Sequence, residues 1–147
     1  NLYWYLTHAC SPVTDGLMPY READLLRNIL DRADAALKEG KNQATLRFGH
    51  ESCLLPLVAL LELNHYGESY PDVEKLSEQW RAYDIFPMAS NVQFVFFHKK
   101  GSNDVLVKVL LNEKETKLPV KTDVAPYYHW KDVESYYREK LDKYQHI

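Results

Sequence analysis

The sequence predicts an α/β fold in which helices pack on a mixed sheet, and three observations lead to that prediction. An amphipathic helical pattern over residues 20–39 is followed by an alternating run at 44–48 and an apolar helical stretch at 54–61. Two later runs, at 92–97 and 105–111, are dense in β-branched and aromatic residues. Helices that alternate with strands in this way are typical of layered α/β domains.

The composition excludes several classes of protein. The 147 residues are about the length of one domain, and an apolar fraction of 46% is enough for a hydrophobic core. The net charge of −3 gives no general attraction to nucleic acid or to an anionic membrane. No apolar run approaches the roughly 20 residues that span a bilayer. We therefore expect neither nucleic acid nor a membrane as a partner.

Residues 20–39 form the first predicted element. Apolar residues recur there at spacings of three and four, and Gly40 follows as a helix stop. They are Leu26, Ile29, Leu30, Ala33 and Leu37. We expect an amphipathic surface helix.

The next run, residues 44–48, alternates apolar and polar side chains as a short strand does. A polar turn at 49–52 separates it from the apolar helix, which Glu51 or Ser52 could cap. We therefore expect a strand, a sharp turn and a helix in direct succession.

The second half of the chain contains the strongest strand signals. After a polar stretch with a short helical piece at 73–80, the runs at 92–97 and 105–111 are apolar on both faces, which predicts strands deep in a sheet. Residues 112–120 suggest a turn and an edge segment, and residues 130–144 a last helix. Three or four strands with helices on two sides make only part of a sheet. We expect residues 1–147 to be a single segment that is incomplete as a domain.

His50 and Glu51, at the predicted strand-to-helix turn, are the best candidates for chemistry. A helix N-terminus favours an anion. His50 could contact a phosphoryl oxygen there, and Glu51 could protonate a departing alkoxide. The structural alternative makes Glu51 a first-turn carboxylate and His50 an ordinary turn residue.

The other candidate sites are weaker. Ser52 could be considered a nucleophile, but the sequence around it lacks the second glycine of a nucleophile elbow. The alternative is that Ser52 caps the helix. His50, His65, Glu51 and Glu62 lack the H-E-x-x-H spacing that places two metal ligands on one helical face, so we expect no metal. Cys10 and Cys53 could form one bridge or remain free thiols, because pairing cannot be read from sequence.

Three stretches resemble the histidine acid phosphatases, and most closely their multiple inositol polyphosphate phosphatase (phytase-like) branch. RFGHESCLLPLVALL is similar to the family's G-H-D-T or G-H-A-E-T motif before a Leu-Pro-Leu helix. FPMASNVQFVFFHK and VLVKVLLNEKETKLP resemble the branch's later pair of strands. The three stretches lie in the family's order and cover most of the chain.

The resemblance implies the C-terminal part of a phosphoglycerate-mutase-like fold and phosphomonoester hydrolysis through a phosphohistidine. It assigns phosphate contact to His50 and proton donation to Glu51. Ser52 stands where one form of the motif has its glutamate, and it becomes a further substrate contact. The nucleophile motif R-H-G-x-R-x-P is absent, so the resemblance implies that the N-terminal half of the enzyme supplies it. No cofactor is implied.

The expected substrate is phytate or a related inositol polyphosphate. One alternative is a sugar-phosphate or general acid phosphatase of the same fold. Another is a non-catalytic domain that binds a phosphorylated ligand or a protein. The resemblance by itself implies a secreted or periplasmic location. The chain begins at Asn1 without a Met or a signal-like segment, and we expect it to be processed, truncated or cut from a longer polypeptide.

Overall fold

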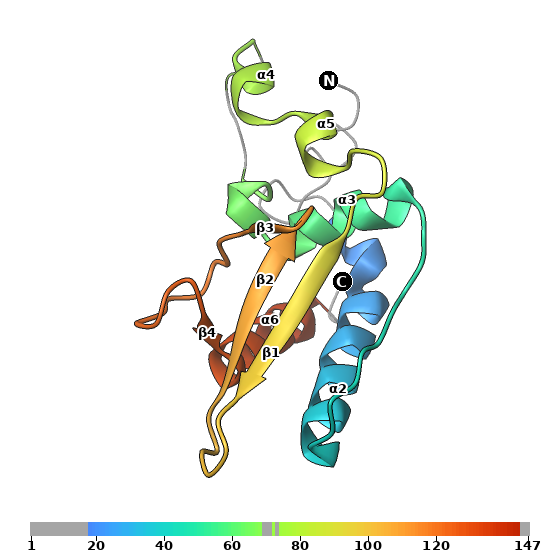
Figure 1. The fold of residues 1–147 in the computed structure, drawn as a ribbon. Coiled ribbons are helices and arrows are strands. Elements are labelled where there is room, and N and C mark those ends of the chain that lie inside the picture. The colour runs from blue at the N-terminus through green and yellow to red at the C-terminus, as the bar shows by residue number, and fades with distance from the viewer. Residues whose placement is uncertain (1–17, 69–71, 73, 145–147) are drawn as a thin grey trace.

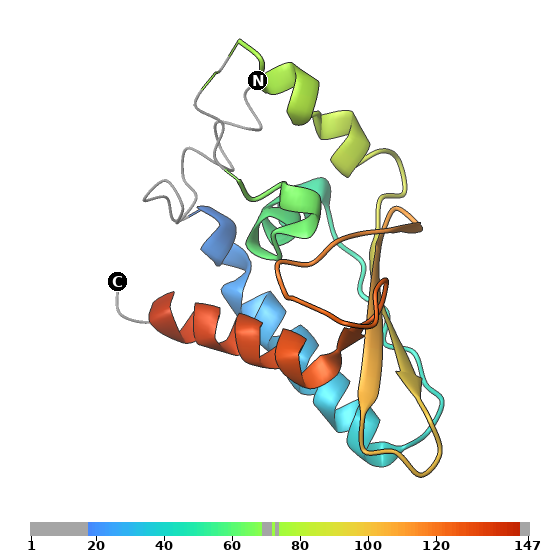
Figure 2. The ribbon, with the colours of Figure 1, turned by 90° about the vertical axis from the view of Figure 1, so that its left-hand side faces the viewer.

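The computed structural model describes residues 18–68, 72 and 74–144. Its helices and strands share one hydrophobic core, and α2 (Ala23–Glu39) and α6 (Trp130–Tyr144) lie on the same side of the sheet (Figures 1 and 2). The sequence predicts helices on two sides, which these two helices do not provide. Both helices and the strand at 105–111 contribute fully buried side chains: Leu26, Leu30, Val107, Val109, Val133, Tyr137 and Leu141. Val58, Leu61, Leu63, Trp80 and Ile85 are equally buried.

The first helix forms where its periodicity predicts. A 3-10 turn, η3 (Met18–Glu22), leads into α2, and Gly40 ends the helix with a φ of 64°. That left-handed conformation suits glycine, which has no Cβ to clash with the preceding carbonyl.

The prediction of a strand at residues 44–48 is wrong. Residues 42–50 run extended beside the sheet, but they pair with no strand in the described part of the chain. Leu46 is 75% exposed and Phe48 is 94% exposed. Alternating apolar and polar residues indicate only which side chains would share a face of a strand. A strand also needs a neighbouring strand whose backbone pairs with its N–H and C=O groups.

The sheet is built around a hairpin. β1 (Val92–His98) and β2 (Val105–Leu111) pair antiparallel, and β3 (Lys114–Glu115) and β4 (Tyr128–His129) both pair with the other edge of β2. Every pair among the described strands is antiparallel, so the parallel pairing of the predicted mixed sheet is not found there. β1 is an edge strand with half-buried side chains, so the prediction that it lies deep in a sheet is also wrong.

α3 (Glu51–Leu60) begins one turn earlier than its apolar pattern. His50 occupies the N-cap position in an extended conformation, with φ −110° and ψ 163°, and no side chain caps the helix. The predicted capping by Glu51 or Ser52 is therefore wrong, because both residues already lie inside the first turn. A short 3-10 turn, η4 (Leu63–His65), follows.

The remaining helices agree with the sequence in different degrees. The helical piece predicted at 73–80 is the shorter α4 (Leu76–Gln79), and α5 (Ala82–Ile85) follows it; Val73 lies outside the described residues. α6 has the predicted bounds, and its buried side includes Val133, Tyr137 and Leu141. Among the described residues, no helix has the length and apolar character needed to cross a membrane.

Candidate functional site

The turn between the extended segment and α3 places His50, Glu51 and Ser52 at the surface. The carbonyl of His50 accepts hydrogen bonds from the N–H groups of Cys53 at 3.0 Å and Leu54 at 3.2 Å, which starts the helix. The side chains of His50, Glu51 and Ser52 are exposed. None of the three forms a hydrogen bond or ion pair with another described side chain. They are thus available to a ligand.

The helix itself is anchored by burial rather than by a polar cap. Residues 55–60 of α3 are all buried, so the apolar segment fixes the position of the turn that precedes it. The N–H groups of Glu51 and Ser52, at the first positions of the helix, have no intrahelical acceptor. They form the positive end of the helix dipole. An anion beside His50 would therefore meet backbone donors as well as the imidazole.

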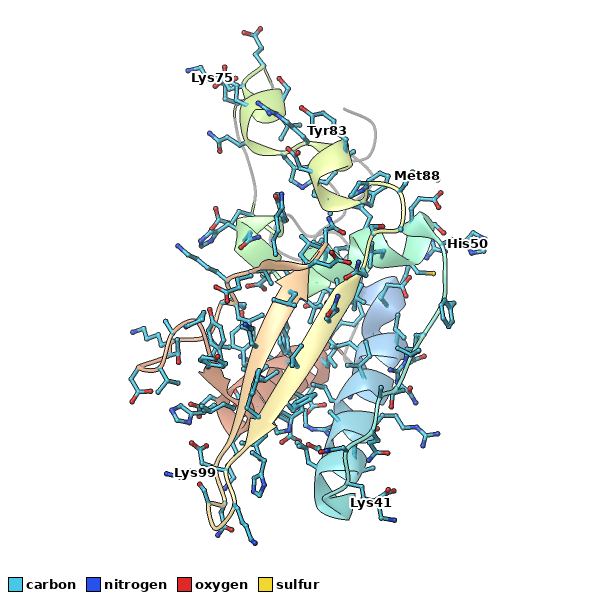
Figure 3. The ribbon with its side chains drawn as sticks, viewed as in Figure 1. Lys41, His50, Lys75, Tyr83, Met88 and Lys99 are labelled. Carbon is cyan, nitrogen blue, oxygen red and sulfur yellow. The ribbon has the colours of Figure 1, made fainter. Side chains whose placement is uncertain are left out.

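His50 and Glu51 lie at one end of a long groove. The groove has a volume of about 2590 Å³ and runs between β1, α2 and residues 40–51. Residues 86–91 line it together with the turn, and Figure 3 shows Met88 and His50 near each other on the right-hand side of the view. The structure therefore brings the first two stretches of the family resemblance together. Lys41 and Lys99 lie at the other end (Figure 3).

One residue that the sequence pattern does not single out organises this end of the groove. Asn112, after β2, has a φ of 51°, and its backbone N–H donates to the carbonyl of Asn91 at 2.8 Å. Its side-chain oxygen accepts from the N–H of Asn91 at 3.1 Å, while its amide nitrogen donates to the carbonyl of Ile85 at 2.9 Å. Asn112 therefore ties α5 and the 86–91 turn to the sheet. The position of an asparagine directly after a clearly predicted strand could have indicated this role, since asparagine tolerates a positive φ.

The structure does not assemble a metal site from the candidate ligands. No group of three or more His, Cys, Asp or Glu side chains with metal-binding geometry occurs among the described residues. His65 contacts Glu68 at 2.6 Å between Nδ1 and Oε1, whereas Glu62 pairs with Lys140. Cys53 carries a free, exposed thiol, and Cys10 lies outside the described residues.

Arg47 is the cation nearest to His50 in sequence. Its guanidinium turns onto α2, where it donates to the side-chain oxygen of Asn28 at 2.6 Å. This contact stabilises the extended segment on the helix. The described residues thus place a histidine, a carboxylate and a helix terminus at the end of the groove.

Comparison with known proteins assigns the chain to a family. Residues 21–112, more than half of the chain, match the histidine phosphatase superfamily (branch 2). The chain is 28% identical over 134 residues to human Multiple inositol polyphosphate phosphatase 1, and 27% identical over 135 residues to the Gallus gallus protein of the same name. These matches cover 82% and 80% of this chain but only 27% and 28% of the relatives, so the chain spans about a quarter of their length. The matched family region contains the His50–Glu51 turn, the 86–91 turn and the β1–β2 hairpin, and the chain belongs to the histidine phosphatase superfamily, branch 2.

Proposed function

We propose that this chain supplies part of the active site of a phosphatase that hydrolyses phosphomonoesters of the inositol polyphosphate class, such as phytate. The observation that carries the proposal is the exposure of His50 and Glu51 at the N-terminus of α3, inside the region that matches the superfamily. The names of the two relatives, both multiple inositol polyphosphate phosphatases, support the substrate class.

In the proposed first step, a histidine from the part of the enzyme outside this chain attacks phosphorus. A P–N bond forms and the bond from phosphorus to the ester oxygen breaks. His50 and the free N–H groups of α3 bind the phosphoryl oxygens, whose negative charge suits the positive end of a helix. Ser52, at the second helical position, can donate a hydroxyl hydrogen bond to the same group.

Glu51 acts first as the general acid and then as the general base in this scheme. An alkoxide is a poor leaving group near neutral pH, so protonated Glu51 gives its proton to the departing oxygen. The resulting carboxylate then accepts a proton from water as that water attacks phosphorus, which breaks the P–N bond and releases phosphate. Both steps need a carboxyl group that reaches solvent and substrate, and Glu51 is exposed at the groove end.

The role of Glu51 is tested with Glu51→Gln in the complete gene product. Because glutamine cannot give up a proton, kcat/KM for inositol phosphates should fall by roughly 10²–10⁴-fold. An aryl phosphate such as p-nitrophenyl phosphate should lose much less, since its leaving group departs without a proton. Glu78→Gln, an exposed carboxylate on α4 that does not line the groove, is the matched control.

Three outcomes would contradict the proposal. An equal loss on both substrates would remove the proton-donor role from Glu51. Phosphate release by the 147-residue chain alone would show that no outside nucleophile is needed. If the complete gene product binds phytate without releasing phosphate, the function is ligand binding instead of catalysis.

A further inference from the structure

Two tyrosine rings from opposite ends of the described chain stack on each other outside the groove. Tyr20 lies in η3, directly before α2, and Tyr144 is the last residue of α6. Their ring centroids are 3.5 Å apart, and the angle between their planes is 10°. Figures 1 and 2 both place the end of α6 near the start of α2. The fold therefore holds two phenols face to face, although they are far apart in the sequence.

Contacts between α2 and α6 keep these two ends together. Arg27 of α2 donates to the carbonyl of Leu141 at 3.1 Å and to Oδ1 of Asp142 at 3.3 Å. Leu141 and Leu26 are fully buried in the same core. Tyr144 follows Leu141 by three residues, which places both on one side of α6. The stack thus depends on the packing of two helices rather than on a chance contact of surface side chains.

The stack also brings the reactive carbons of the two rings close together. A tyrosyl radical carries part of its unpaired electron on the ring carbons beside the phenolic oxygen, and two such carbons can bond. At a centroid separation of 3.5 Å, the carbons of one ring lie in van der Waals contact with those of the other. Both tyrosines are half-buried, so each also has a side that is accessible from solvent.

The described part of the chain has a second pair of neighbouring tyrosines, which differs in both respects. Tyr136 and Tyr137 meet edge to face, with an angle of 82° between their planes and centroids 5.3 Å apart. Tyr137 is also fully buried, and its hydroxyl donates to the carbonyl of Leu61. This pair is therefore poorly placed for coupling, which leaves Tyr20 and Tyr144 as the candidates.

We propose that Tyr20 and Tyr144 are an oxidative cross-linking site, at which a haem peroxidase and hydrogen peroxide join the two rings as dityrosine. The proposal does not depend on the proposed phosphatase function. The cross-link fastens the start of α2 to the end of α6. Because it closes a long loop of the chain, it lowers the entropy of the unfolded state and should stabilise the fold.

The reaction removes two hydrogen atoms from the protein. Burial raises the pKa of Tyr20, and the charges of Glu62 and Tyr144 raise it further, so this phenol is protonated near neutral pH. The peroxide takes one electron and one proton from each phenol and leaves as two water molecules. The two phenoxyl radicals form one carbon–carbon bond between carbons ortho to their oxygens. The proton on each bonded carbon then moves to the oxygen of its own ring, which restores both phenols.

The test is oxidation of the complete gene product by a haem peroxidase and hydrogen peroxide, followed by peptide mapping with mass spectrometry. We expect one linked peptide pair that contains Tyr20 and Tyr144 and is lighter by two hydrogen atoms. Its yield should not depend on protein concentration, because both rings belong to one molecule. Dityrosine fluorescence should appear together with the linked peptides.

Phenylalanine variants separate stacking from exposure. Tyr20→Phe and Tyr144→Phe should each lose the linked peptides, because phenylalanine keeps the ring but has no hydroxyl group to oxidise. Tyr83→Phe is the control: Tyr83 lies on α5 and is 66% exposed, and its loss should leave the yield unchanged. Oxidation should raise the thermal midpoint of the unaltered protein but not that of Tyr144→Phe.

Unfolding in urea before oxidation gives a further comparison. The linked peptides should then be lost, because the stack exists only in the folded chain. This comparison uses the unaltered protein, so it decides the question even if a phenylalanine variant fails to fold. An equal yield in urea would overturn the proposal, as would linked peptides that persist in Tyr144→Phe. A loss in Tyr83→Phe equal to that in Tyr20→Phe would also overturn it, as would cross-links only between molecules.

Discussion

At the scale of single residues, His129 shows how side chains hold a loop against the sheet. Its Nδ1 lies 3.0 Å from Asp104 Oδ2, and its Nε2 lies 3.0 Å from Asp123 Oδ1. His129 belongs to β4, Asp104 directly precedes β2, and Asp123 lies in the loop before β4. The hydrogen bonds to Asp104 and Asp123 raise the pKa of His129, and the bond to His129 lowers the pKa of Asp123. A doubly protonated imidazole can donate to both carboxylates at once.

This geometry predicts a pH dependence of folding stability. A histidine whose pKa is raised in the folded state stabilises it fully below the unfolded pKa of about 6.5, and the contribution is lost as pH rises through the raised value. The urea midpoint should therefore decrease as the pH rises above about 6.5. His129→Gln should flatten that part of the curve, whereas His98→Gln, which removes a hydrogen bond to the carbonyl of Ser102, should not. An unchanged slope in His129→Gln would contradict the assignment.

At the scale of elements, α6 is fastened to the end of α3 by polar groups at the edge of the core. Lys140 donates to the carbonyl of Leu60 at 2.7 Å and forms a close ion pair with Glu62. Tyr136 donates to the other oxygen of Glu62 at 3.0 Å, and Tyr137 to the carbonyl of Leu61 at 2.8 Å. Burial lowers the pKa of Lys140, partly offset by Glu62. These bonds satisfy carbonyls that the helix end leaves without partners.

The pairing predicts the effect of removing one partner. Lys140→Met should lower the free energy of unfolding by about 2 kcal/mol, because Glu62 loses its cation and Leu60 its donor. This is less than the roughly 3–5 kcal/mol of a fully buried pair, since the two side chains remain 16% and 26% exposed. The double variant Lys140→Met/Glu62→Gln should recover part of the loss. Urea denaturation measures both.

Lys143→Met provides the control on the same helix. Its side chain is exposed, so its effect should stay within about 0.5 kcal/mol. A loss in Lys143→Met equal to that in Lys140→Met would mean that general helix charge, not the pair, stabilises α6.

At the scale of the whole molecule, the unusual feature is apolar surface gathered along one groove. Phe48 and Leu46 stand exposed on its wall, and the outer face of α2 forms its floor. A patch of this kind marks a surface that another part of a protein covers. It agrees with the expectation of an incomplete domain.

The groove predicts binding of a hydrophobic dye such as anilinonaphthalene sulfonate by the isolated chain. The double variant Leu46→Ser/Phe48→Ser should bind less dye, because it removes the two exposed apolar side chains of the wall. Tyr83→Ser, which lies outside the groove, should bind as much as the unaltered chain. A compact monomer without dye fluorescence would contradict the incomplete-domain reading.

Local pattern was sufficient for most helices and strands. The spacing of three and four predicts α2 and α6, since it reports an apolar stripe on one helix. Dense β-branched and aromatic runs predict β1 and β2 almost to the residue. The His50–Glu51 turn follows from the boundary between two such patterns, and the family from short motifs around it.

The sequence by itself therefore determined the main helices, the β1–β2 hairpin, the turn with His50 and Glu51, and the family, because each depends on residues close in the chain. The tertiary structure decided which elements have neighbours. It left residues 44–48 unpaired, made β1 an edge, placed α2 and α6 on one face, and gave Asn112 and Lys140 their partners. These features depend on groups that are distant in sequence. The periodicity within one segment does not indicate which other segment pairs or packs with it.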